Sequence, residues 1–575
     1  MAANAAKTAG PSLAFLLEAL GAVWWRLTGG LRCWTRASWL YRALRLRGPL
    51  ADRMAVHPYD ALPRKLDNAD ALLRGRFRFQ GETVDADNRS IFDHPAPSAE
   101  WNEALHAFAW LPPLSAAGGE AARTLATNLV TQWLKRHGRY TEPAWLPHVM
   151  GRRLIALFAH GRFILTNSDV MWRSKVFVSL REQSRMLARI AGEAPEGLPR
   201  LEAAAALALS GACLCDSPRR TEAGLARLEA ELARQILPDG GHISRSPERL
   251  VEAFRLVVMV MDALAATNHA VPQGLRSAHD RMAPMLRFFR HGDGALALFN
   301  GGTEGDARMI SALLSRDDVK GLPFAYARHS AYQRMASART LVLLDCGGPP
   351  PPAFSANAHA GCLAFELSTG PHRIVVNCGT AVFASHRRWL SALRATAAHS
   401  TLTLDDTSSS AVLREGWVSR LLGARMFHGP SEIETRRVET EKGWTVVTSH
   451  DGYNHPFGVR HERELTLSPH GLALTGTDRL LPHDMKKHTA TPFAVRFHVH
   501  PDVRVSTAQS GDTILKLPNG EGWRFRANLP VAVEESVYLG NDTVRRCDQL
   551  VITGSVKNEQ VDIGWLFEQI GTNLQ

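Results

Sequence analysis

Motifs of several common enzyme classes are missing from this sequence. No GxGxxG follows an expected strand and no GxxxxGK[ST] is present, so a nucleotide-binding fold has no support. There is no HExxH pair, which argues against a zinc protease, and no GxSxG turn, which argues against an α/β hydrolase. The chemistry of the chain must therefore be sought in other residues.

Patterned cysteines and long apolar runs are also lacking. The 7 cysteines of the 575 residues are scattered and form no CxxC pair, which excludes a disulfide framework or a zinc ribbon as the organising element. No stretch of about 18 uninterrupted apolar residues occurs, so no membrane-spanning helix is predicted.

The N-terminus has an apolar segment, "SLAFLLEALGAVWW", but not the other features of a signal peptide. Glu18 interrupts the segment, only Lys7 precedes it, and no small-residue cleavage site follows. The next stretch, residues 26–48, contains six arginines and no acid, with Trp, Leu and Tyr between them. It is either a basic amphipathic segment for an anionic membrane surface or the solvated face of a first helix.

The charge balance favours an anionic partner. Lys and Arg number 67 against 56 Asp and Glu, a formal net charge of +11, which suits nucleic acid, a membrane surface or an acidic polysaccharide. The expected strands have no RNP-like aromatic pattern and the helices no recognition-helix signature, so nucleic acid is not expected.

The hydrophobic period divides the chain into two large parts. From about residue 95 to 330, apolar residues recur every three to four positions in segments of similar length, which predicts paired helices in a ring or array. After about residue 335 they alternate, and turn residues separate the segments, which predicts antiparallel sheets packed as a sandwich. We expect an N-terminal basic and apolar segment over 1–60, a helical domain over 61–335 and a β domain over 336–575.

Polar residues gather where these segments begin or end. "DGGHISRSP" places His242 and Ser246 at the start of an expected helix, where they serve either as reactive groups or as a helix cap. In the β part, Asn357, His359 and His399 precede expected strands and Asn377 ends one. Such side chains can bind metal, orient a carboxylate or move protons, although a histidine at a strand end is often only hydrogen-bonded.

Together these segments resemble the heparinase II/III family of polysaccharide lyases and its relatives among alginate and oligo-uronide lyases. The resemblance rests on "DGGHISRSPERL", "NAHAGCLAFELS", "VVNCGT" and "AAHSTLTL", with smaller similarities in "LHAFAWL", "YQRM" and "RFHVHP". It implies an incomplete (α/α) toroid followed by an antiparallel β-sandwich, and β-elimination on a uronic-acid polysaccharide. That reaction needs a group that neutralises the C6 carboxylate, a base for the C5 proton and an acid for the leaving oxygen. It needs no redox cofactor.

Carried onto this chain, the resemblance implies His242 or His359 as base, Tyr453 or Tyr332 as acid, and Arg245, Arg249 or Arg200 beside the substrate carboxylate. The expected substrate-binding residues are Arg200, Arg245, Ser246, Asn357 and Arg394. Zinc, which some members hold with two His and one Asp, would be bound by His359, His399 and Asn377. Because an amide is a weaker ligand than a carboxylate, the resemblance allows zinc without requiring it.

The chain departs from the family at positions that carry the chemistry. Arg249 stands where the family has its usual tyrosine, Leu250 follows where a histidine is common, and Pro199 and Arg200 stand where Asn-His is usual. Two hypotheses therefore stay open: a divergent lyase, and an acidic-glycan-binding protein that keeps the fold without the elimination. A glycoside hydrolase is a third, with Asp239, Glu248, Glu304 and Asp306 available but in no recognisable pair.

Two features of the sequence predict different cellular locations. The resemblance points to the periplasm or cell envelope. The lack of a convincing leader points to the cytoplasmic side, where the arginine-rich segment would contact the inner membrane.

Overall fold

The computed structural model covers most of the chain. It describes residues 13–49, 51, 53–61, 66–87, 89–214, 218–316, 323–381, 387–413, 416–441, 443–483, 490–509, 511–541 and 543–571. Lys7, which precedes the N-terminal apolar segment, and Cys215, one of the scattered cysteines, lie outside these ranges.

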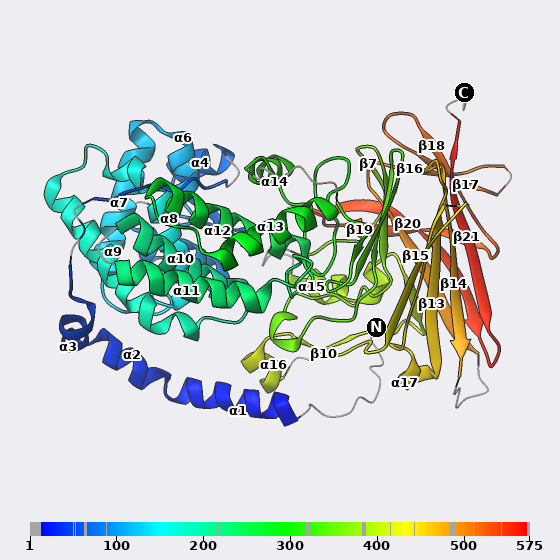
Figure 1. Cartoon of the computed structure of the whole chain (residues 1–575), viewed down its shortest axis with the longest axis horizontal. Coiled ribbons are helices and arrows are strands. Elements are labelled where there is room, and N and C mark those ends of the chain that lie inside the picture. The colour runs from blue at the N-terminus through cyan, green and yellow to red at the C-terminus, as the bar shows by residue number, and fades with distance from the viewer. Residues whose placement is uncertain are drawn as a thin grey trace.

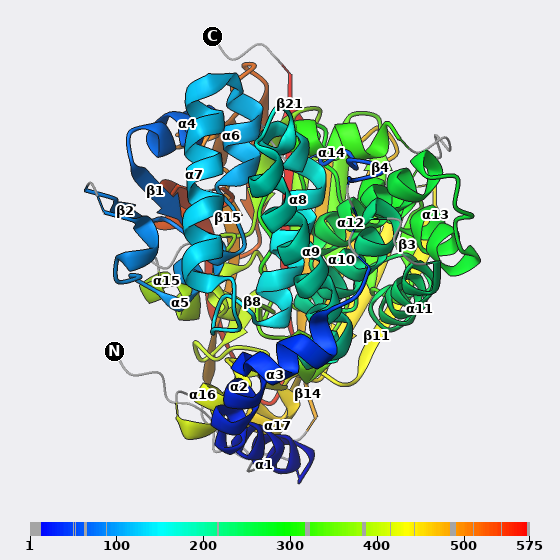
Figure 2. The same ribbon diagram turned by 90° about the vertical axis from the view of Figure 1, so that its left-hand side faces the viewer.

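A helical region and a region of antiparallel sheets lie side by side along the long axis of the molecule (Figure 1). A chain of short N-terminal helices follows one long edge and touches both regions (Figures 1 and 2). The predicted fold class, a helical toroid followed by a β-sandwich, is confirmed.

The N-terminal helices form an arm. It contains α1 (Leu13–Leu27), α2 (Gly29–Ala37), α3 (Trp39–Tyr41) and the π-helical turn η1 (Arg42–Leu46). Ala19 of α1 packs on Leu422 of α16 (Trp417–Leu422) in the β region, and Glu18 forms an ion pair with Arg425 at 2.5 Å. At its other end η1 packs on α9 (Val170–Ile190) of the helical region. Among the described residues, no helix has the length and hydropathy needed to cross a bilayer.

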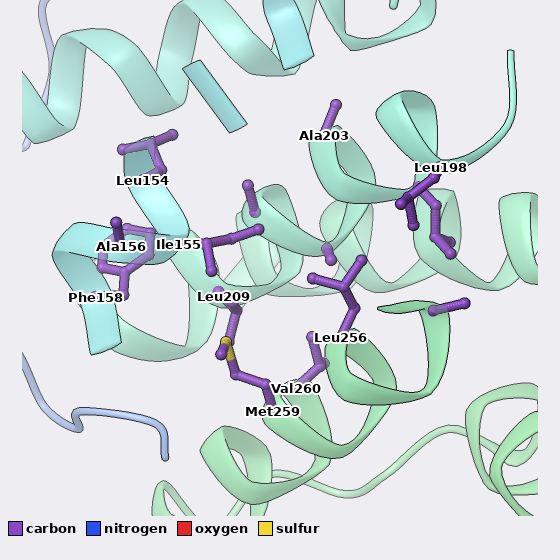
Figure 3. Packing of buried hydrophobic residues seen from close by; sticks show 14 of the residues in the cluster. Leu154, Ile155, Ala156, Phe158, Leu198, Ala203, Leu209, Leu256, Met259 and Val260 are labelled. Carbon is purple, nitrogen blue, oxygen red and sulfur yellow. The ribbon is translucent and has the colours of Figure 1, made fainter. Parts of the chain in front are cut away.

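The helical region buries its apolar residues between layers of helices (Figure 3). Nearly every residue of α10 is buried, because α8, α11 and α12 surround it. Gly224 of α11 permits a close approach to α10, since a Cβ there would lie 2.8 Å from the Leu207 carbonyl oxygen. The elements are α4 (Leu66–Leu73), β1 (Arg76–Phe79), β2 (Glu82–Asp85), α5 (Ala99–His106), α6 (Leu111–Ala117), α7 (Gly119–His137), α8 (Pro147–Leu165), α9, α10 (Leu198–Leu214), α11 (Pro218–Gln235), α12 (Pro247–Ala266), α13 (Gln273–Phe288) and α14 (Ala307–Leu314).

One expected helix is divided in two. The periodic stretch "WNEALHAFAWLPPL" contains the end of α5 and the start of α6, separated by a turn in which Phe108 has a φ of +60°. Phe108 is buried against Trp110 and Trp133, so packing holds a backbone conformation that a phenylalanine seldom adopts.

The β region consists of two large antiparallel sheets. One has the order β11-β12-β13-β14-β21-β18-β17-β16; the other has the order β19-β20-β15-β7-β6-β5-β4-β3, with β8 also paired to β15. The strands are β3 (Tyr326–Ala327), β4 (Tyr332–Ser337), β5 (Thr340–Asp345), β6 (Phe365–Thr369), β7 (His372–Val376), β8 (Leu402–Leu404), β9 (Ala411–Val412), β10 (Met426–His428), β11 (Ile433–Thr440), β12 (Gly443–His450), β13 (Val459–Leu467), β14 (Ala473–Pro482), β15 (Thr491–Val499), β16 (Arg504–Thr507), β17 (Thr513–Lys516), β18 (Gly522–Ala527), β19 (Val531–Tyr538), β20 (Arg545–Val556) and β21 (Val561–Ile570). Short helices α15 (Arg387–Leu393), α16 and α17 (Asn454–Phe457) interrupt them.

The expected boundary between residues 335 and 336 falls inside a strand. Strand β4 pairs with β5 from Tyr332 onward, so the β region already includes residues assigned to the helical domain. The polar and aromatic residues before position 336 obscured the alternation that the pairing shows.

Candidate functional site at the junction of the two regions

The "DGGHISRSP" loop lies where the helical and β regions meet. The Asp239 carboxylate accepts hydrogen bonds from the backbone N–H groups of His329 and Ser330, at 2.8 and 2.6 Å, and so fixes the loop to the start of the β region. Gly240 has a φ of +89°, and a Cβ there would lie 1.9 Å from the Arg281 carbonyl oxygen. The glycine is therefore required by both the turn and the close packing on α13.

His242 is buried and both ring nitrogens have partners. Nε2 lies 3.2 Å from Gln235 Oε1, and Nδ1 lies 2.7 Å from Ser244 Oγ. Because Gln235 Oε1 can only accept, Nε2 carries the proton and Nδ1 accepts from the Ser244 hydroxyl. Burial lowers the His242 pKa to about 3, with the Arg249 charge as a smaller cause. His242 thus lies in the predicted loop as a neutral, fully hydrogen-bonded ring.

Arg245 connects the helical region to the β region. Its guanidinium forms an ion pair with Asp345 and donates to the carbonyl oxygens of Ser330 at 2.9 Å and Gly348 at 2.7 Å. It also lies over the ring of Tyr332, 4.7 Å from the centroid. Because the guanidinium is buried and each of its three nitrogen atoms already donates to a protein oxygen, the expected substrate-binding role does not fit this position.

Two neighbours of Arg245 have polar groups without a partner. The Ser246 hydroxyl is buried and forms no hydrogen bond with any residue that the structure describes, so it does not cap α12 through its side chain. Arg249 is half-buried on the first turn of α12, and no ion pair or hydrogen bond of its side chain is found among the described residues. Arg249 is therefore the predicted arginine that remains available to an anion.

The other expected substrate-binding residues divide into two kinds. Arg200 donates to Ala194 O and pairs with Glu196, at the start of α10. Arg394 is buried and donates to the carbonyl oxygens of three residues, Ser355, Ala358 and Ala424; burial without a carboxylate lowers its pKa to about 10. Both arginines hold loops in place. Asn357, by contrast, is exposed.

His359 and His399 meet ring to ring, as the motif comparison implies. His359 Nδ1 lies 3.1 Å from His399 Nε2, and His399 Nδ1 donates to Ala395 O at 2.9 Å. His399 therefore accepts through Nε2, and the proton between the rings belongs to His359. His359 Nε2 is buried and has no hydrogen-bond partner in the described part of the chain. Burial lowers both pKa values, that of His399 to about 4, so the pair is neutral at neutral pH.

Asn377 does not complete a zinc site with this pair. Its Oδ1 accepts from the Ser400 N–H at 3.0 Å, and its Nδ2 donates to Leu298 O at 3.2 Å. Within the described part of the chain, no group of three or more His, Cys, Asp or Glu residues is placed to hold a metal ion. Because the amide is occupied and no carboxylate joins the histidines, the donor set does not fit zinc as arranged.

Neither candidate acid reaches a substrate in this arrangement. The Tyr453 hydroxyl is buried inside the β region and donates to Leu402 O at 2.9 Å. The Tyr332 hydroxyl donates to Arg245 O at 2.7 Å and accepts from Asn300 Nδ2 at 2.8 Å. Burial raises the pKa of both phenols. Tyr453 is therefore part of the core of the β region, and Tyr332 is part of the junction between the two regions.

The carboxylates considered for hydrolysis are also engaged. Asp239 binds backbone N–H groups, Asp306 caps α14, Glu304 accepts from Tyr538, and Glu248 accepts from Thr303 at 3.0 Å. Each has a structural partner of its own, and among the described residues no hydrogen bond joins any two of them.

Sequence reasoning missed the residues that complete the junction. Asp345 balances Arg245, and Asn300 connects Tyr332 and Asp345. The signal was an aspartate at the end of the otherwise apolar strand "RTLVLLD", where an unpaired charge would be costly.

Comparisons with known proteins place these observations in context. A protein-family model described as "Heparinase II/III-like, C-terminal" matches residues 319–566. FtsZ-localized protein C of Caulobacter vibrioides is 32% identical over 531 residues, which is 90% of each chain. Among solved structures, a mutant of the heparan sulfate lyase HepC from Pedobacter heparinus is 15% identical, with a TM-score of 0.61 over 91% of this chain and 84% of that one. Heparinase III is 14% identical, with a TM-score of 0.62 over 86% and 80%.

Proposed function

This chain belongs to the heparinase II/III-like family, and we propose that it is a membrane-surface binding protein that keeps the lyase fold without the elimination chemistry. The observation that carries the proposal is an exposed apolar stripe along the N-terminal arm. The absence of elimination chemistry is supported by the candidate base His242 and the candidate acids Tyr332 and Tyr453, whose side chains are buried and hydrogen-bonded within the protein.

The stripe follows one face of α1 and α2. Its side chains are 60 to 75% exposed and recur at intervals of three and four residues, which places them on one side of a helix. They are Leu17, Leu20, Trp24, Leu27, Leu31 and Trp34. Ala19, between them, faces α16 and is buried. The arm thus docks on the protein by small residues and presents its large apolar ones outward.

The chemistry of the arm suits an anionic lipid surface. No acidic residue occurs between Glu18 and Asp52, whereas arginines recur through residues 26–47. Tryptophan and arginine together favour the interface between headgroups and acyl chains, and a basic segment is drawn to the negative cytoplasmic leaflet. We therefore place the protein on the cytoplasmic face of the membrane.

The relative from Caulobacter vibrioides suggests where on that membrane the protein gathers. Its name associates it with FtsZ, and it matches this chain over 90% of both lengths. We extend that association to this chain as part of the proposal: the arm supplies membrane contact, and the folded regions supply contact with an FtsZ-containing assembly.

Vesicle sedimentation tests the membrane half. The full chain should sediment with vesicles of phosphatidylcholine and phosphatidylglycerol, and Leu20→Glu with Trp24→Glu should abolish this, because charge cannot enter the acyl region. The matched control is Leu472→Glu with Val533→Glu, which alters two exposed apolar residues of the β region. Equal sedimentation of both double variants would contradict the proposal.

A second candidate function is binding or cleavage of an acidic polysaccharide at the junction. Arg249 supports it, because this half-buried guanidinium has no ion pair among the described residues. The test is ultraviolet absorbance of the C4–C5 double bond after incubation with heparin, heparan, alginate and chondroitin, with and without zinc. A rise that His359→Ala removes would establish a lyase. Salt-sensitive binding without a rise, lost in Arg249→Ala, would establish a glycan-binding protein.

A further inference from the structure

A basic groove opens beside the arm on the surface of the helical region. It lies between η1, the end of α7 and the first half of α9, and has a volume of about 560 Å³. Its cationic lining residues are Arg42, Lys135, Arg136, Arg139 and Lys175. One acid, Glu182, is also part of the lining.

The positive charges exceed the negative ones that contact them. Glu182 pairs with Arg42 at 2.9 Å, and Arg136 pairs with Asp93 at 2.6 Å. No ion pair or hydrogen bond of the Lys135, Arg139 or Lys175 side chain is found in the described ranges. Three exposed cations therefore line one groove with no counter-ion among the described residues.

Exposed apolar side chains belong to the elements that line the groove. Met171, which lines it, is 69% exposed. On the other side, Arg42 belongs to the same helical stretch as Trp39 and Leu44, which are 76 and 72% exposed. In the proposed docked state these side chains would enter the bilayer interface and bring the cations to the depth of the lipid phosphates.

The lining also discriminates between kinds of anion. It contains serines and aliphatic stems but no aromatic ring on which a nucleotide base could stack. Lysine and arginine without such a ring suit a phosphate group whose remaining part is small and polar.

We propose that this groove binds the phosphate-bearing headgroup of an anionic phospholipid, and so determines which lipids the arm selects. The inference rests on the proposed membrane docking and adds lipid selectivity to it. The stripe supplies insertion into the bilayer, the arginines of the arm supply general attraction to a negative surface, and the groove adds recognition of the phospholipid headgroup.

The test uses the full chain and vesicles of phosphatidylcholine alone or mixed with phosphatidylglycerol. Arg139→Ser with Lys175→Ser should weaken binding to the mixed vesicles roughly 30-fold, because each cation near an anionic surface contributes about fivefold. The control, Arg227→Ser with Arg276→Ser, removes the same charge from exposed positions of α11 and α13. It should have a much smaller effect.

The outcomes separate the two proposals. If Leu20→Glu with Trp24→Glu abolishes binding while the groove variant and its control bind equally well, the proposed headgroup site is wrong and the proposed membrane docking stands. Full binding of the stripe variant would overturn docking itself. Calorimetry with glycerol 3-phosphate distinguishes the sources: tight binding of this soluble phosphate, with no change in lipid preference in the groove variant, would assign the groove to a soluble anion and contradict the proposal.

Discussion

At the scale of single residues, two arginines at the junction have different roles. Arg245 and Arg249 are four positions apart in "SRSPER", and sequence reasoning gave both to an anionic substrate. Arg245 is buried against Asp345, one hundred positions away, and Arg249 is not. Only the long-range pairing distinguishes them, and a single sequence contains no direct record of it.

Removing one partner of this buried pair should destabilise the protein strongly. Arg245→Ala leaves the Asp345 carboxylate buried without its cation, which should lower the free energy of unfolding by about 3–5 kcal/mol. Urea denaturation followed by circular dichroism measures it. Arg249→Ala is the matched control and should change the free energy by less than about 0.5 kcal/mol. Similar losses in both variants would show that the pairing is not what stabilises the junction.

The buried histidines predict a dependence of stability on pH. Because burial lowers the pKa of His242 to about 3 and of His399 to about 4, the unfolded chain takes up these protons first as the pH falls below its ordinary histidine pKa of about 6.5. Their contribution to stability is present above that pH and is lost on acidification toward the folded pKa values.

His242→Gln should flatten this acid dependence. The slope of unfolding free energy between about pH 6 and 4 should decrease by about 1.4 kcal/mol per pH unit, because one titrating ring is removed. Urea midpoints measured across this pH range supply the slope. His470→Gln, at an exposed position in a β turn, is the control. An unchanged slope in His242→Gln would contradict the assignment of a neutral buried ring.

At the scale of elements, helices and strands were predictable where one period ran through a whole segment. The segments that became α9, α11 and α12 have such a pattern, and so do those of β13 and β14. The failures came where tertiary contacts override local pattern. Phe108 breaks an apparently continuous helix because its ring fills a space between two tryptophans, and β4 exists because β5 lies beside it.

Docking of α1 on α16 should be separable from the rest of the fold. Ala19 and Leu422 belong to a small apolar cluster apart from the two main cores. Ala19→Asp should therefore release α1 and speed proteolytic cleavage in the arm, while the main thermal transition stays in place. Limited proteolysis with mass spectrometry reports the first effect and calorimetry the second. Ala22→Ser is the mild control, and arm cleavage as slow as in the unmodified chain would count against the contact.

At the scale of the whole molecule, ionic contacts unite the helical and β regions. Glu366 on β6 accepts from His291 Nε2 at 2.9 Å and from the Leu298 N–H at 3.0 Å. Arg373 on β7 donates to Asp293 at 2.8 Å and to Leu296 O at 2.9 Å. The sequence predicted a helical domain followed by a β domain, but none of these four side chains was assigned a role, because each lies in an ordinary strand or loop pattern.

These contacts predict one cooperative unfolding transition. Arg373→Ala should separate it into two in differential scanning calorimetry, since Glu366 and Asp293 would lose their shared cation across the junction. Arg479→Ala breaks a comparable pair with Glu462 and Glu464 inside one sheet and should leave a single peak. Two peaks in both variants, or in neither, would show that this arginine does not couple the regions.

The arm follows the long edge of the molecule and touches both regions, rather than extending from one end (Figures 1 and 2). A protein held along its flank cannot swivel as one held by a flexible tether does. Every docked copy would have the same side up, at a constant height above the lipid. In the proposed docked state its opposite flank would face away from the lipid in a single orientation, so that neighbouring copies would present the same surface to the proposed FtsZ-containing assembly.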